Sequence, residues 1–266
     1  IITLFRYIPM FGLIIAFKNY SVGKGIIKSP WVGLQIFINF FNDPYCFRII
    51  KNSFLLGIYM LIFSFPAPII LALLFNEVGN RSYKKISQTI SYLPHFISVI
   101  IIVGILKTMF STSGIVNQVL NYFGLSTINF FSASEWFRPL YIFSEIWQNV
   151  GFNAIIYLAA ISGIDQTIYE AAIIDGANRF QIMHRITIPS IMPTVKILFI
   201  LAISGILGNN FEKIYLMYSP LTYDTADVIS TYVYRRGIEM ADFGYGTAVG
   251  LFQSVFAFSL LYVSNY

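Results

Sequence analysis

The chain has 266 residues, of which 57% are hydrophobic and only 11% are charged, whereas an average soluble domain carries about 25% charged residues. This composition excludes an ordinary soluble domain and predicts a membrane protein. The net charge of +5 comes with no nucleic-acid motif, the single cysteine excludes an internal disulfide, and no Cys/His cluster has metal-ligand spacing.

Six apolar segments reach or approach the roughly 20 residues that a spanning helix needs. The chain starts and ends inside apolar runs, so we expect a fragment trimmed at both ends; the first run, which contains Arg6, is then the remainder of a helix rather than a signal peptide. The expected fold is an all-α membrane protein that forms one domain over residues 1–266. Its six expected spanning helices are 1–17, 53–75, 90–110, 140–163, 188–208 and 246–266.

Two features inside these segments affect helix geometry. Pro66 and Pro68 remove backbone donors and predict a kink in the second helix, with neighbouring helices covering the freed carbonyls. Small residues at Gly246–Gly250 and Ala159–Gly163 allow close helix packing.

The connections differ in length between the two sides of the membrane. Residues 76–89 and 162–187 lie on one side, and the longer connections 18–52, 111–139 and 210–245 lie on the other. The longer side holds more Lys and Arg, but in proportion to its length, so the positive-inside rule does not fix the orientation.

The stretch from Glu170 to Pro189, EAAIIDGANRFQIMHRITIP, interrupts apolar surroundings with small and charged residues. Thr167 followed three residues later by Glu170 predicts a capping box, and Gly176 permits a turn. We therefore expect two short helices with a bend, and entry into the next spanning helix at Pro189. The mixed surface suits docking into a groove of another protein, while an amphipathic linker on the membrane surface fits the residues equally well.

This stretch resembles the EAA loop of permease subunits in ATP-binding-cassette importers. The family pattern runs from Glu-Ala-Ala through Gly to Ile-x-Leu-Pro, and here Ile188 replaces the usual Leu. Strings such as RYIPMFGLIIAFKNY and WQNVGFNAIIYLAAISGID resemble the branch that moves oligosaccharides and polysaccharide fragments. The residues to which the resemblance gives a role in ATPase coupling are Glu170, Ala171, Ala172, Asp175, Gly176, Ala177, Ile186 and Pro189.

The resemblance implies a multi-pass subunit of a bacterial cell membrane complex. Its loop would be cytoplasmic and fit an ATPase subunit, which would place 111–139 and 210–245 outside the cytoplasm. The implied partners are a second permease subunit in a heterodimer, two ATPase subunits and an extracytoplasmic substrate-binding protein. Since the chain has no Gly-rich phosphate loop, we expect it to be no enzyme and to carry no cofactor, with ATP and Mg bound by the partner ATPases. Transport would proceed by alternating access.

A path for an oligosaccharide needs polar side chains inside an apolar bundle. Residues 140–163 offer polar side chains at spacings of three and four, which place them along one helix stripe. An acid at membrane depth costs roughly 2.5–3.5 kcal/mol on insertion scales and faces a cavity or partner; for the amides, interhelical hydrogen bonding is the alternative. The path candidates are Glu145, Gln148, Asn149 and Asn153, with Asn209, Asn210, Gln253 and Tyr59 beyond this stripe. His95 is expected to be structural.

Residues 223–243 combine charges with an apolar stripe formed by Val228, Ile229, Tyr232 and Val233. We expect a helix along the surface that contacts the binding protein, with a solvated connector as the alternative. The predicted contacts are Asp224, Asp227, Arg235 and Arg236.

Two other functions compete with oligosaccharide import. The same machinery could carry a peptide, an amino acid or another small solute. An intramembrane enzyme or channel is disfavoured, because His95 and His184 are isolated and Glu145 has no evident acidic companion.

Overall fold

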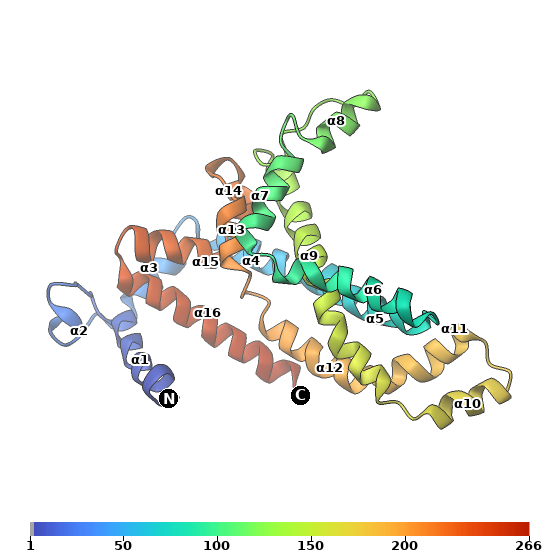
Figure 1. Cartoon of the computed structure of the whole chain (residues 1–266). Coiled ribbons are helices and arrows are strands. Elements are labelled where there is room, and N and C mark those ends of the chain that lie inside the picture. The colour runs from blue at the N-terminus through green and yellow to red at the C-terminus, as the bar shows by residue number, and fades with distance from the viewer. Residues whose placement is uncertain (1–2, 266) are drawn as a thin grey trace. The chain divides into compact units, whose positions relative to one another are not determined.

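The computed structural model describes residues 3–265, so residues 1 and 2 of the first expected helix lie outside the described part. Within residues 3–265 the chain forms helices joined by turns, with no β-strand and one isolated antiparallel bridge between Lys18 and Trp31 (Figure 1). The expectation of an all-α chain is confirmed for this part of the molecule.

The α-helices are α1 Ile8–Met10, α2 Gly25–Lys28, α3 Gln35–Phe41, α4 Cys46–Tyr59, α5 Pro66–Glu77, α6 Arg81–Tyr92, α7 Val99–Met109, α8 Ile115–Tyr122, α9 Ser134–Ser162, α10 Gln166–Ile174, α11 Arg179–Ile182, α12 Ile188–Ser204, α13 Phe211–Met217, α14 Tyr223–Ala226, α15 Ile229–Val233 and α16 Phe243–Ser264. Between them lie the π segments η1 Thr3–Tyr7, η3 Met60–Ser64, η5 Met183–Thr187 and η7 Tyr234–Glu239, and the 3-10 segments η2 Phe11–Phe17, η4 Leu93–Phe96 and η6 Pro220–Thr222.

The helices gather into two compact units. Unit 1 comprises Ile1–Gly57, Phe110–Arg138 and Ser204–Tyr266, and unit 2 comprises Ile58–Met109 and Pro139–Ile203. Each unit is therefore assembled from segments that are distant in sequence, and each is described separately below.

Three described helices are long and apolar enough to cross a membrane, namely Cys46–Glu77, Arg179–Ser204 and Phe243–Ser264. A fourth span results if the bent pair Arg81–Phe96 and Val99–Met109 is counted as one. Helix α9, Ser134–Ser162, is long but is absent from this group, because Glu145 and the amides that follow it lower its hydropathy. The expected count of six spans remains a prediction.

The expectation of one continuous helix over 90–110 is wrong. The helix formed by α6 and η4 spans Arg81–Phe96, and α7 begins at Val99. The axes of these two helices are bent by 99° relative to each other. Pro94 has no amide hydrogen to continue the ladder, and Ile97 adopts an extended conformation with ψ of 134°. The expected connection 76–89 is also largely helical, because the Asn80 side chain caps α6 by accepting a hydrogen bond from the Tyr83 amide.

Two prolines follow π segments rather than ending helices. The segment Met60–Ser64 precedes Pro66, and Met183–Thr187 precedes Pro189. A proline cannot donate and its ring crowds the carbonyl four residues earlier, and the wider π turn accommodates both effects. Residues Arg179–Ser204 consequently form one helix, so the expected separate short helix before Pro189 is wrong.

The core of unit 2 joins α5, α9 and α12. Its buried members are Ala72, Ala154, Tyr157, Ile161 and Ile191. On the same helix α9, Gly151 lies so close to α6 that a Cβ atom there would be 2.0 Å from the Ser91 carbonyl oxygen. The missing side chain is therefore what allows α6 and α9 to touch.

We expect Gly151→Ala to destabilise the protein by about 1–3 kcal/mol, the usual cost of overpacking. Gly104→Ala in α7 is the matched control, because a Cβ atom there would meet nothing within 4 Å, and the change should be neutral or stabilising by up to about 1 kcal/mol. Thermal unfolding in detergent measures both. Equal melting temperatures for the two variants would contradict the close approach.

Unit 1 is built around the first half of α16, where Gly244, Tyr245, Gly246, Ala248 and Val249 are buried. A Cβ atom on Gly246 would lie 2.9 Å from the Cα of Gly237 in η7, so the predicted close packing is found at Gly246. A Cβ atom on Gly250 would meet nothing within 4 Å.

Candidate functional site

The segment that follows α9 is an ordered helix–turn–helix on unit 2, and its second helix, which begins with α11, continues into α12. Its first helix, α10, is capped by Asp165, whose Oδ1 accepts a hydrogen bond from the Thr167 amide at 2.9 Å. This amide bond lowers the pKa of the Asp165 carboxyl. The predicted capping box of Thr167 and Glu170 is wrong, because Thr167 already lies in the first turn of α10 and Asp165, two residues earlier, occupies the cap position.

A Schellman motif ends α10. The Ala177 amide donates to the Ala172 carbonyl at 2.9 Å, and the Gly176 amide donates to the Ile173 carbonyl at 3.0 Å. Gly176 has φ of +79°, the left-handed conformation that this motif places on glycine. The predicted turn at Gly176 is confirmed. The glycine of the Asp-Gly-Ala sequence is explained by this turn, which needs a residue in the left-handed conformation.

The next helix starts at once, because Asn178 and Gln181 form a capping box. The motif that ends α10 and the capping box that starts the next helix thus lie within a few residues of each other. The surface around this turn exposes apolar side chains to solvent. Ile174 is 85% exposed, and Ile173 and Phe180 are also exposed. Glu170, Asp175 and Gly176 are exposed beside them. Ile186 lies half-buried in η5, and Pro189 is exposed in the first turn of α12.

The polar stripe of α9 reaches the break between η4 and α7. Asn149 is held at both ends of its amide: its Nδ2 donates to Glu145 Oε2 at 3.0 Å, and His95 Nδ1 lies 2.9 Å from its Oδ1. Since an amide oxygen only accepts, the His95 ring donates here. Gln148 Nε2 donates to the Ile97 carbonyl at 3.3 Å, in the break itself.

His95 also stacks on Phe152 of α9, with ring centroids 3.9 Å apart and planes 3° from parallel. These contacts give His95 the structural role that the sequence predicts. Glu145 and Gln148 are buried, while Asn153, further along α9, is exposed and lies outside these contacts.

The remaining path candidates are spread over both units. Tyr59 lies on α4 in unit 2 beside Phe63. In unit 1, each of three amides has a backbone partner: Asn209 Nδ2 donates to the Ser53 carbonyl at 3.1 Å, Asn210 Oδ1 accepts from the Lys213 amide at 3.2 Å, and Gln253 Nε2 donates to the Leu207 carbonyl at 2.7 Å.

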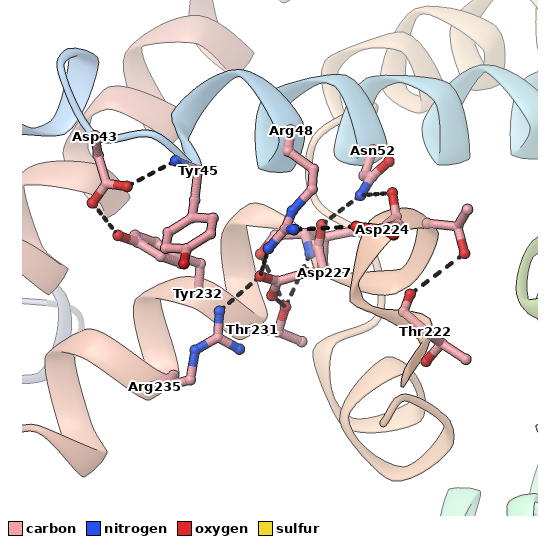
Figure 2. Close-up of polar contacts among 12 residues, drawn as sticks. Asp43, Tyr45, Arg48, Asn52, Thr222, Asp224, Asp227, Thr231, Tyr232 and Arg235 are labelled. Atoms are coloured by element: carbon pink, nitrogen blue, oxygen red, sulfur yellow. Dashed lines mark hydrogen bonds and ion pairs between the residues drawn. The ribbon is translucent and has the colours of Figure 1, made fainter. Parts of the chain in front are cut away.

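Unit 1 contains a polar network that the sequence did not predict (Figure 2). Its centre is Asp227, whose side chain is 0% exposed. Thr231 Oγ1 donates to Asp227 Oδ1 at 2.9 Å, Arg235 Nη2 lies 2.7 Å from Oδ2, and Arg48 Nη2 lies 3.7 Å from the same oxygen. Asp227 therefore joins α4 to the segment that contains α15 and η7.

Asn52 on α4 strengthens this junction. Its Nδ2 donates to the carbonyls of Asp224 and Asp227, both at 3.0 Å, and its Oδ1 accepts from Arg138 Nη2 at 2.8 Å. The segment 223–243 is helical in part, as expected, but its apolar stripe does not lie along the surface, because Val228, Ile229 and Tyr232 are buried in unit 1.

Of the four predicted binding-protein contacts, Asp227 is buried and Arg235 is largely buried against it. Asp224 is 80% exposed and pairs with Arg48 at 3.2 Å, and Arg236 lies 4.6 Å from the ring centroid of Tyr245. A direct contact with another protein is therefore sterically open to Asp224 and Arg236, and the burial of Asp227 gives it an internal role instead.

A second contact set joins the same segment and the first turn of α16 to Asp43, which lies just before α4. Tyr232 donates a short hydrogen bond to Asp43 Oδ2, and Tyr245 donates to that oxygen at 3.2 Å. Burial alone would raise the pKa of Asp43, but the hydrogen bonds from Tyr232, the Tyr45 amide and Tyr245, together with the charge of Arg236, outweigh it and lower the pKa. Burial and the Asp43 carboxylate raise the pKa of Tyr232 to about 12.

Among the described residues, no group of three or more His, Cys, Asp or Glu side chains could hold a metal ion.

Comparison with known proteins identifies relatives over nearly the whole chain. Residues 64–266 match the family model of the binding-protein-dependent transport system inner membrane component. Protein LplB of Bacillus subtilis (strain 168) is 44% identical over 99% of this chain and 83% of its own length. The polygalacturonan/rhamnogalacturonan transport system permease protein YteP of the same organism is 42% identical over 98% of this chain and 82% of its own length.

Two solved structures have the same fold. One is a bacterial ABC transporter involved in the import of the acidic polysaccharide alginate, in which a chain matches with a TM-score of 0.93 and 45% identity over 99% of this chain and 89% of that one. The other is a bacterial alginate ABC transporter in complex with an alginate pentasaccharide-bound periplasmic protein, with a TM-score of 0.92 and 44% identity over 99% of this chain and 88% of that one.

Proposed function

Because this chain belongs to the binding-protein-dependent transport system inner membrane component family, we propose that it is the permease subunit of an ATP-driven importer and forms half of the path for an oligosaccharide. The observation that carries this proposal is the exposed helix–turn–helix after α9. It holds Glu170 and Gly176 at the EAA positions on a surface with unpacked isoleucines. A surface of this kind suits insertion into a groove of another protein.

The cargo follows from the relatives and from the chemistry of the α9 stripe. One relative is named for transport of polygalacturonan and rhamnogalacturonan, and the matched structures import alginate. Amide side chains suit sugar hydroxyls, and Asn153 is an exposed amide on the polar face of α9. We therefore favour an oligosaccharide over a peptide, an amino acid or another small solute.

In this mechanism the helix–turn–helix lies in the cytoplasm and docks on an ATPase subunit that binds ATP and Mg. Closure of two such ATPases moves the loop, and this chain and a second permease subunit rock between inward and outward openings in the bacterial cell membrane. The chain crosses the membrane six times, and the His95–Asn149–Glu145 contacts hold the broken helix α6–α7 against α9.

An extracytoplasmic binding protein delivers the sugar to unit 1. Asp224, which is exposed, and Arg236, which is partly exposed and lies near Asp242, are the side chains we propose for this contact. The network beneath them keeps the segment 223–243 in one conformation, so that the surface is already ordered before the partner arrives.

Uptake into cells that produce the chain with its transport partners tests the cargo. We expect labelled oligosaccharides of galacturonate or alginate to accumulate only when the complete system is present, and an unlabelled oligosaccharide in excess to compete. Labelled di- and tripeptides serve as the control. Accumulation of the peptides without any accumulation of an oligosaccharide would reject the sugar assignment while leaving the importer assignment intact.

A further inference from the structure

The loop from Lys18 to Leu34, which joins η2 to α3, has a composition unlike the rest of unit 1. Residues 1–42 contain no Asp or Glu, and this loop carries Lys18, Lys24 and Lys28. Several of its apolar side chains are exposed to solvent: Ile27 is 86% exposed, and Val22, Trp31 and Leu34 are also exposed. Figure 1 shows α2 on this loop, standing away from α16. Basic and apolar groups are thus displayed together with no acid among them.

The loop is held in one conformation by its own polar groups. The Lys18 ammonium donates to the carbonyls of Ile26 at 2.8 Å and Ile27 at 3.3 Å, and it lies 5.9 Å from the ring centroid of Trp31. Ser29 Oγ donates to the Gly25 carbonyl at 2.7 Å. Lys18 therefore stabilises the loop from within. Ile27 is exposed because these hydrogen bonds hold the loop in this conformation.

Contacts with α16 place this loop at one end of a membrane span. A Cβ atom on Gly244, the second residue of the candidate span Phe243–Ser264, would lie 3.3 Å from the Lys18 carbonyl oxygen. The ring of Tyr20 lies 6.2 Å from that of Phe243, edge to face. The loop thus starts at the level where α16 begins, which is where a bilayer changes from hydrocarbon to headgroups.

We propose that the loop 18–34 is a binding surface for anionic phospholipid, with Ile27 and Trp31 entering the bilayer interface and Lys24 and Lys28 meeting headgroup phosphates. A membrane surface supplies both chemistries side by side: apolar chains for the exposed side chains and negative charge for the two lysines. Tryptophan is enriched at this depth, since its ring is amphipathic. The inference concerns lipid contact and does not rest on the proposed cargo or on ATPase coupling.

The test places a fluorophore at Ile27→Cys in the full chain, reconstituted with its copurifying subunits in nanodiscs. Cys46 is buried, so the parent chain reports background labelling. We expect quenching by lipid-attached nitroxide to rise as phosphatidylglycerol replaces phosphatidylcholine. Lys24→Gln and Lys28→Gln should each lower the ratio of inserted to free loop about fivefold, because a lysine near an anionic membrane contributes about 1 kcal/mol.

The matched control is Arg81→Gln with Lys85→Gln, which removes two exposed charges from α6 and should leave quenching at Ile27 unchanged. The proposal is overturned if the probe stays in water in every lipid mixture. It is also overturned if quenching is the same with and without phosphatidylglycerol, or if only an added binding protein shields the probe. An equal loss of quenching in the two lysine variants and in the Arg81→Gln/Lys85→Gln control would likewise reject specific recognition by Lys24 and Lys28.

Discussion

Replacing Glu170 with Lys should lower uptake by about 100-fold or more, while the amount of chain in the membrane stays the same. Glu170 is exposed on α10, so the reversal disturbs no internal packing and acts on whatever docks there. Placing a like charge against a docked partner costs several kcal/mol, and about 3 kcal/mol already corresponds to a loss of more than about 100-fold. Quantitative immunoblotting of membranes and initial uptake rates measure the two quantities separately.

Gly176→Val should have a similar effect on uptake by another route. A valine at φ of +79° is strained, and a changed turn would shift Glu170 relative to Phe180. The strain does not come from a steric clash with neighbouring residues, since a Cβ atom at Gly176 would meet nothing within 4 Å. Gly79→Val is the matched control, with equally open surroundings and no positive φ. Normal uptake in both Glu170→Lys and Gly176→Val would remove the coupling assignment.

Features that depend only on residues close together in the chain could be predicted from the sequence, as the turn at Gly176 shows. The Asp-Gly-Ala stop and the apolar segments depend on neighbours along the chain, so the turn at Gly176 and the apolar helices Cys46–Glu77 and Phe243–Ser264 were predicted. The ends of Phe243–Ser264 were close to the expected ones, whereas Cys46–Glu77 begins well before the expected residue 53. The break between Phe96 and Val99 was missed, because apolar residues continue through it. The break is held by Gln148 and Asn149, which come from another helix.

The candidate site divides in the same way. The EAA positions form one short motif within a single stretch of sequence, and their role in ATPase coupling stays a prediction. Asn52 and Asp227 are 175 residues apart and meet only in the folded chain. Their hydrogen bond therefore could not be predicted from any local stretch of the sequence. Burial of Val228 and Ile229 was missed for a related reason, since an apolar stripe predicts a covered face but does not specify the surface that covers it.

The junction around Asp227 leads to the second large effect, which is on stability. Asp227→Asn keeps the side-chain shape but removes the charge that Arg235 and Arg48 face. Breaking a buried ion pair by removing one partner costs about 3–5 kcal/mol, because the remaining charge is left without compensation. We expect the melting temperature to fall steeply, measured by the reaction of a thiol dye with Cys46, which is buried at the start of α4.

Asp224→Asn separates this internal role from docking. It removes an acid of the same segment that also pairs with Arg48, but its side chain is 80% exposed, and exposed pairs contribute about 1 kcal/mol or less. It should leave the melting temperature nearly unchanged. If Asp224 contacts the binding protein, Asp224→Asn weakens that complex without unfolding unit 1, whereas Asp227→Asn weakens it only as unit 1 loosens. Equal melting temperatures for the two variants would contradict the buried anchor, because the predicted difference rests on burial alone.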